Sequence, residues 1–180
     1  MKPIGPIIAV MFALLAPAHA SAETRARDLC AAMPKAAAEA ALKLRAFGAD
    51  ALDDRLGAYR RQMCRMQTEP GETIELTVWS LRGGRAFAPL PARAEACDVG
   101  CLAAGREPNL YLYAQKRIGA ALCVTRRPRP DRDLATGAIT ACTLGAARRI
   151  MLAVARKQGL APAPMETVKS LLDRAAGAFR

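Results

Sequence analysis

The sequence predicts a mainly α-helical fold: a single disulfide-stapled helical domain with a small β-hairpin. Apolar residues recur at steps of three and four over most of the chain, and they alternate with polar residues over only one stretch. Aromatic residues make up 4% of the chain while alanine is abundant, which predicts a thin core of Leu, Ile, Met and Ala. The six cysteines, an even number, indicate disulfides.

Residues 1–22 have the organisation of a secretory signal peptide. Lys2 precedes an apolar run over residues 7–15, and the small residues that follow allow cleavage after Ala20 or Ala22. The run is shorter than the ~20 residues that a membrane helix needs, and no later stretch approaches that length. Arg outnumbers Lys 21 to 6, a bias of GC-rich bacterial genomes. We therefore expect a bacterial protein without a transmembrane segment, periplasmic or secreted, in which residues 23–180 form a single domain.

The first predicted unit, residues 23–66, is helical. Pro34 is tolerated in a first helical turn but not in a helix interior, so it divides a short helix up to Met33 from a second helix over residues 34–47. Asp50 is a good N-cap for a third helix, which would run to Met66. Its predicted apolar stripe consists of Leu52, Leu56, Tyr59, Met63 and Met66.

A β-hairpin is predicted over residues 72–89. From Thr73 to Leu81, apolar and polar residues alternate with the period of a half-buried strand. Gly83 and Gly84 favour a tight turn, and a short return strand over residues 86–88 would end at Pro89. The same turn, flanked by Arg82 and Arg85, has a weaker alternative interpretation as an anion-binding nest.

Residues 109–159 are predicted to form a basic helical hairpin. The first helix covers residues 110–124, although residues 110–113 could equally begin a strand, and a loop of arginines and prolines follows. The second and longest helix ends at Gly159. Its stripe consists of Ile139, Cys142, Ala146, Ile150 and Val154. A last amphipathic helix is predicted over residues 165–179.

All the cysteines follow the predicted leader. They are Cys30, Cys64, Cys97, Cys101, Cys123 and Cys142. In an oxidising compartment we expect three structural disulfides. Cys30 and Cys64 lie at opposite ends of the first helical unit, so they can meet if its helices fold back on one another. Two arrangements are possible for the other four cysteines. Either Cys97 bonds Cys101 and Cys123 bonds Cys142, or Cys97 and Cys101 bond to Cys123 and Cys142. We favour the first arrangement.

Several chemistries are excluded or weakened. The only histidine, His19, leaves with the leader, which excludes a Ser-His-Asp or Cys-His catalytic pair and a His-ligated zinc site. Cys97 and Cys101 are one residue further apart than the cysteines of thiol oxidoreductases. Asp53 and Asp54 point to different sides of a helix, where the helix dipole explains them better than catalysis does. We expect no enzymatic activity, no cofactor and no metal.

The basic excess is concentrated in one part of the chain. Between Lys116 and Lys157 there are ten Lys and Arg against two Asp, a local charge of +8. Guanidinium groups suit phosphate and carboxylate, so this region predicts an anion-binding surface, with a solvated charged loop as the alternative. The candidate residues are Lys116, Arg117, Arg126, Arg127, Arg129, Arg132, Arg148 and Arg149.

These observations predict an exported, non-enzymatic binding or accessory protein. Its basic hairpin would engage an anionic component of the cell envelope or an acidic protein, and nucleic acid is an unlikely partner in that compartment. An alternative is an assembly or stabilising component of an envelope or secretion machine that acts through protein–protein contacts. A small enzyme without histidine is the least favoured hypothesis.

Overall fold

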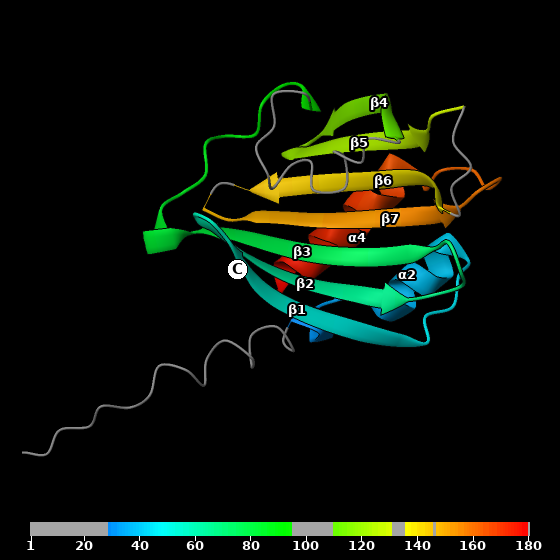
Figure 1. Ribbon diagram of the computed structural model, residues 1–180, viewed down its shortest axis with the longest axis horizontal. Helices are drawn as coiled ribbons and strands as arrows, with labels where there is room; N and C mark the ends of the chain where they lie inside the picture. Colours follow the sequence, from blue (N-terminus) through cyan, green and yellow to red (C-terminus); the bar gives the residue numbers. More distant parts are fainter. Residues whose placement is uncertain (1–28, 95–109, 131–135, 146, 180) are drawn as a thin grey trace, which may run out of the picture.

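The computed structural model describes residues 29–94, 110–130, 136–145 and 147–179. The seven strands in these ranges form one sheet in the order β1-β2-β3-β7-β6-β5-β4, with every neighbouring pair antiparallel. Two helices pack on one face of this sheet (Figure 1). The fold is therefore mainly β, and the prediction of a mainly helical domain is wrong.

Strands β1 (Gly48–Leu56), β2 (Tyr59–Gln67) and β3 (Thr73–Leu81) form the first meander. The bounds of β3 are those predicted from its alternation. The predicted third helix, by contrast, is the β1–β2 hairpin, whose two-residue turn has Gly57 at a φ of 60°. Glycine reaches that conformation without strain. Leu52 and Leu56 pair directly with Met63 and Tyr59 across this hairpin, so these four residues of the predicted stripe share one face of the sheet. Only Met66 lies on the other face.

Strands β4 (Leu110–Ile118), β5 (Ala121–Pro128), β6 (Thr136–Gly145) and β7 (Arg149–Lys157) form the second meander. They replace the predicted basic helical hairpin. After β3 the chain passes to the far edge of the sheet and returns strand by strand until β7 pairs with β3. The edge strands are thus β1 and β4, from different meanders.

The central strands are buried on both faces, which explains why they resembled helices. From Met151 to Ala155 every residue of β7 is buried, and the same holds from Ala121 to Thr125 in β5. A short continuous apolar run has no two-residue period, so periodicity cannot separate it from a buried helix. Alanine, a strong helix former, occupies several of these positions and added to the wrong prediction.

Helices α2 (Lys35–Leu42) and α4 (Met165–Gly177) cover one face of the sheet (Figure 1). Residues 29–31 are also helical. Helix α2 was predicted to extend to residue 47, but it ends at Leu42, because Lys43 adopts a left-handed backbone conformation with a φ of 53°. The C-terminal helix is confirmed. Leu171 and Leu172 of α4 join Ile74, Leu76 and other sheet residues in the main core.

A strap, defined as residues 85–94, follows β3 and holds to the opposite face of the sheet. Phe87 stacks on Tyr59 of β2, with ring centroids 6.0 Å apart, and Ala94 joins a second apolar cluster over the central strands. The backbone N–H of Ala94 donates to Oε1 of Gln115 in β4 over 2.8 Å. The predicted return strand at 86–88 is therefore wrong: no strand is assigned there, and β3 pairs instead with β2 and β7.

Candidate anion-binding site

Four of the basic candidates belong to edge strand β4, to its neighbour β5 and to the residue that follows Pro128 at the end of β5. We define the basic edge as Lys116, Arg117, Arg127 and Arg129, together with Tyr113. All four cations lie between Leu110 and Pro130, a stretch that also contains Arg126 and no acidic residue. Because β4 is a sheet edge, this charge lies at a boundary of the fold and not within its centre.

Arg127 and Tyr113 form the clearest contact of the basic edge. The β4–β5 register shifts between Leu112 and Ala114, which places Tyr113 at a β-bulge. Bulges redirect side chains, and the Arg127 guanidinium carbon lies 3.7 Å from the centroid of the Tyr113 ring. The ring is 51% exposed. This stacking orients the guanidinium without neutralising it.

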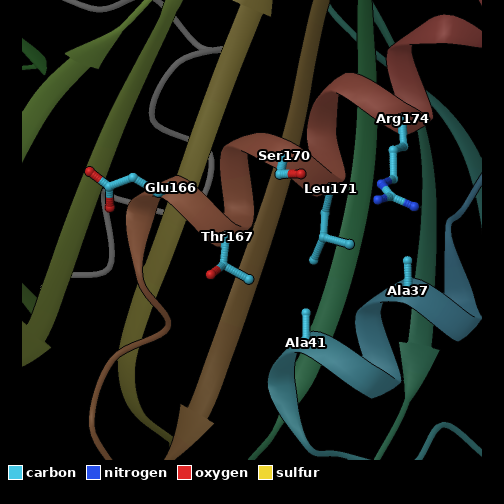
Figure 2. A pocket seen from close by; sticks show the side chains of 7 residues that line it. All are labelled: Ala37, Ala41, Glu166, Thr167, Ser170, Leu171 and Arg174. Atoms are coloured by element: carbon cyan, nitrogen blue, oxygen red, sulfur yellow. The ribbon is translucent and has the colours of Figure 1, made fainter.

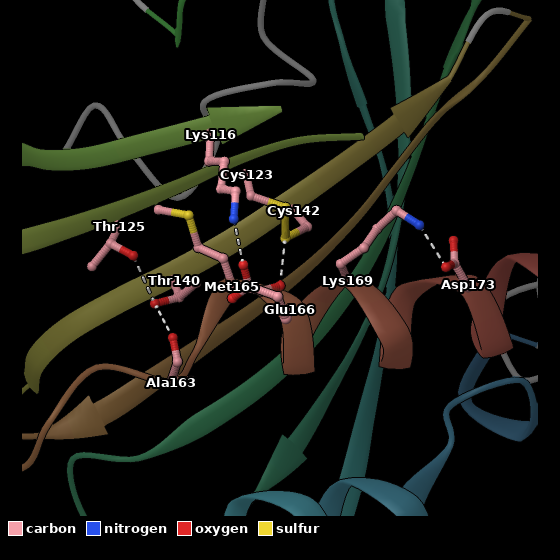
Figure 3. The surroundings of a disulfide bond; sticks show 10 residues. All are labelled: Lys116, Cys123, Thr125, Thr140, Cys142, Ala163, Met165, Glu166, Lys169 and Asp173. Atoms are coloured by element: carbon pink, nitrogen blue, oxygen red, sulfur yellow. Dashed lines mark hydrogen bonds and ion pairs between the residues drawn. A yellow bond between two sulfur atoms is a disulfide. The ribbon is translucent and has the colours of Figure 1, made fainter. Parts of the chain in front are cut away.

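Lys116 and Arg117 point to opposite faces of β4. Lys116 Nζ lies 2.8 Å from Oε1 of Glu166 on α4, and both side chains are 61% exposed (Figure 3). This hydrogen bond is the largest cause of the lowered pKa of Glu166. Arg117 Nη2 donates to the backbone oxygens of Leu90 and Pro91 in the strap, over 2.9 and 2.8 Å. Carbonyl acceptors leave the charge of Arg117 in place.

The remaining candidates are not part of this surface. Arg149 is 1% exposed, and it contacts the strap from the face of β7. Arg126 is half-buried in β5, where it pairs with Leu112 of β4. Arg148 is exposed just before β7, while Arg132 lies outside the described residues. The structure therefore gathers about half of the predicted set and assigns Arg149 a structural position.

Both disulfides of the described residues are those that the sequence favoured. Cys30 bonds Cys64 of β2, and Cys123 of β5 bonds Cys142, its direct partner across the strand pair in β6, with Cα atoms 4.0 Å apart. The second bond lies beneath the start of α4, where Cys142 Sγ is 3.5 Å from the backbone oxygen of Met165 (Figure 3). Cys97 and Cys101 lie outside the described residues. Two disulfides are compatible with an exported protein.

Asp50, Asp53 and Asp54 lie in strand β1, so the predicted helix cap and first helical turn are wrong. Asp53 and Asp54 are adjacent on β1 and point to opposite faces, where each meets an arginine of β2. Arg60 binds Asp53 through Nε and Nη2, over 2.9 and 2.5 Å, and Arg61 binds Asp54 in the same way over 3.0 and 2.6 Å. Arg61 also lies over the buried Trp79 ring, 5.6 Å from its centroid. The two carboxylates form no catalytic pair.

Two hollows flank the helices and the basic edge. One, of about 350 Å³, lies between α2 and α4, and Figure 2 shows Glu166 and Arg174 at opposite ends of it, with small side chains between them. The other, of about 460 Å³, adjoins Arg127 and includes Gly137 and Leu160. In the ranges that the structure describes, no group of three or more His, Cys, Asp or Glu residues could hold a metal ion.

Sequence reasoning missed a third hollow, which we name the arginine pocket. It has a volume of about 310 Å³, and it lies where the β1–β2 turn meets the end of β3. Its lining residues are Arg55, Tyr59, Arg60, Ser80, Leu81 and Arg82. The sequence does show arginines on both sides of each turn. These arginines point to a shared pocket only once the two turns are known to be neighbours.

Comparisons with family models, with curated proteins and with solved structures found no match to this chain. Among the helices of the described residues, none is long and apolar enough to cross a membrane. The function therefore has to be argued from the geometry of the surfaces above.

Proposed function

We propose that this chain is an exported, non-enzymatic binding protein that engages an anionic component of the cell envelope through its basic edge. The observation that carries the proposal is the run from Leu110 to Pro130, with five basic residues and no acidic one, on an edge strand and its neighbour. The leader-like residues 1–22 and the two disulfides support export.

The arrangement of the basic edge favours a partner with repeated charges. Arg127 is stacked on Tyr113, and Arg117 is held by backbone carbonyls, so both guanidiniums are oriented while keeping their charge. The ion pair between Lys116 and Glu166 is well exposed, and such pairs contribute little. A phosphate- or carboxylate-bearing polymer or lipid surface can displace Glu166 and contact several of these cations at once.

Retention on heparin-agarose tests the proposal. A triple variant, Lys116→Gln, Arg127→Gln and Arg129→Gln, removes three charges while sparing Arg117, which holds the strap. We expect elution at clearly lower salt, because each lost anion contact reduces the salt dependence of binding. The matched control removes three exposed charges from the helical side and the start of β1, through Lys35→Gln, Arg45→Gln and Arg174→Gln. Equal elution of the two triple variants would contradict a localised site.

A second candidate function, assembly through protein contacts, is favoured by the other edge of the sheet. Leu52 and Leu56 of β1 are 38% and 44% exposed, and Phe47, just before the strand, is 59% exposed. Exposed edge strands with apolar side chains are templates for strand addition. Co-purification of one protein that resists high salt and is lost on Leu52→Lys would favour this candidate, and an acidic partner captured in a salt-sensitive way would favour the basic edge.

A further inference from the structure

The arginine pocket lies at the opposite side of the sheet from the basic edge, because β1 and β4 are the two edge strands. Its floor is set by strand register. Arg55 of β1 is the direct partner of Arg60 in β2, and Arg60 is in turn the partner of Ser80 in β3. Like charges directly opposite one another destabilise a sheet. Packing alone therefore does not account for this pair.

A third arginine is fixed beside the pair by the backbone. The N–H of Arg82 donates to the carbonyl oxygen of Ala58 in the β1–β2 turn over 2.9 Å. This bond joins the turn at the end of β3 to the turn between β1 and β2. Gly83 and Gly84, with φ of 73° and 70°, allow the chain to leave immediately after Arg82. The backbone of Arg82 is thereby fixed beside the pocket that this residue lines.

The charge of the pocket is only partly balanced. Asp53 binds Nε and Nη2 of Arg60, which leaves Nη1 outside the pair. The pKa of Asp53 is lowered first by this hydrogen bond, and the nearby charge of Arg55 lowers it further. Within the described part of the chain, no hydrogen bond or ion pair joins the side chain of Arg55 or Arg82 to an acid. Three guanidiniums thus face one carboxylate, an excess of two positive charges.

We propose that the arginine pocket binds a dianionic phosphate group, free or as the terminal group of a monoester. Phosphate at neutral pH carries nearly two negative charges, which matches the excess in the pocket. Guanidinium groups suit phosphate oxygens, three arginines line the pocket, and the Ser80 hydroxyl is a further donor. Tyr59 and Leu81 also line the pocket, as the residues next to Arg60 and Ser80 in β2 and β3. The volume is at the small end of ligand sites, which fits a headgroup or a small metabolite.

Calorimetric titration of the full mature chain with inorganic phosphate and with phenyl phosphate at low salt tests this proposal. We expect both to bind and acetate, which is monovalent, to bind more weakly; tighter binding of phenyl phosphate identifies an ester as the natural form, and equal binding identifies free phosphate. Arg82→Ala and Arg55→Gln should each weaken phosphate binding about tenfold, since hydrogen bonds to charged groups are the strong ones. Arg85→Ala, an exposed neighbour that does not line the pocket, is the matched control and should change the affinity less than twofold.

Asp53→Asn gives a result of opposite sign that a damaged fold would not produce. It releases Arg60 from its carboxylate partner, so phosphate should bind several-fold tighter. Unchanged affinity in Arg55→Gln, Arg82→Ala and Asp53→Asn, or an equal loss in Arg85→Ala, would overturn the proposal. So would acetate binding as tightly as phosphate. The triple variant of the basic edge should retain phosphate binding, so this pocket and the proposed function can fail separately.

Discussion

Arg149 Nη2 donates to the backbone oxygen of Ala88 over 2.6 Å, joining a buried side chain of β7 to the strap. The guanidinium carbon of Arg149 lies 5.0 Å from the centroid of the Phe87 ring. Arg149 is the direct partner of Trp79 in β3, so it also lies beside a large buried ring. This arginine therefore holds the segment that crosses the sheet from the first meander toward the second.

Arg149→Met should destabilise the fold by about 2 kcal/mol, because it removes a charged hydrogen bond and leaves the Ala88 carbonyl without this donor. Urea unfolding measures the difference. Arg148→Met is the matched control: its side chain is exposed, and the change should stay within about 0.5 kcal/mol. Equal losses of unfolding free energy in the two variants would show that the buried contact of Arg149 does not stabilise the fold.

Replacing Cys123 and Cys142 by alanine should lower the free energy of unfolding by about 3 kcal/mol. The two residues are 19 positions apart, and the cross-link restricts the unfolded chain accordingly. Urea unfolding with and without reductant measures this. In the double variant, reductant should have a smaller effect than in the wild type, because only other disulfides remain to be reduced. An unfolding midpoint that is the same with and without this pair would contradict a stabilising role.

Asp53 should make the fold more stable above its unfolded-state pKa than in acid. Its pKa is lowered in the folded protein, chiefly by the hydrogen bond from Arg60. The stabilisation is therefore fully present above the unfolded value of about 3.9 and is lost as the pH falls through the lower folded pKa. Asp53→Asn should remove up to about 1 kcal/mol at pH 7 and flatten the acid limb of the stability profile. Parallel profiles for the two proteins between pH 2 and pH 7 (roughly the range in which carboxylates titrate) would disprove this.

Gly137→Ala and Gly177→Ala should change stability in opposite directions. A Cβ at Gly137 would lie 2.8 Å from the backbone oxygen of Lys157, where β6 pairs irregularly with β7, so we expect a loss of about 1–3 kcal/mol. At Gly177, the last residue of α4, nothing lies within 4 Å of an added Cβ, and alanine should stabilise the helix by up to about 1 kcal/mol. Thermal unfolding of both variants measures the pair, and a gain at Gly137 would be incompatible with the close approach of the two strands.

Local patterns predicted those elements whose two faces differ. Strand β3 has apolar and polar residue types in alternation from Thr73, although residues 76–79 are all buried in the structure. Helix α4 has buried residues at helical spacing, with Val168, Leu172 and Ala175 on its inner side. Both were recognised from the sequence. Strands β5 and β7 are covered on both sides, and such strands have no alternation to detect. In β1 and β2, four of the residues that suggested a helical stripe do share one face, because Leu52 pairs with Met63 and Leu56 with Tyr59 across the turn. A hairpin can therefore reproduce the apolar surface that helical spacing suggested.

The candidate sites were also predicted only in part from the sequence. The sequence favoured both observed disulfides, but it left open bonds from Cys123 and Cys142 to Cys97 and Cys101, and it expected Cys30 to meet Cys64 through helices that the structure does not have. The density of arginines between residues 110 and 130 also located the basic edge. The position of Arg149 in the core, and the meeting of Arg55, Arg60 and Arg82, depend on which strands are neighbours, and charge counting contains no such information.

By itself, the sequence determined which reactive and charged residue types are available: one histidine inside a leader-like segment, six cysteines, and a basic stretch free of acids. It also determined strand β3, through its alternating residue types, and helix α4, through its one apolar face. Only the tertiary structure decided that the remaining segments are strands, and that the ends of β1, β2 and β3 enclose a pocket. The physical reason is that sheet pairing joins residues far apart in the chain, so the partner of each residue is set by the whole sheet and not by its own neighbours.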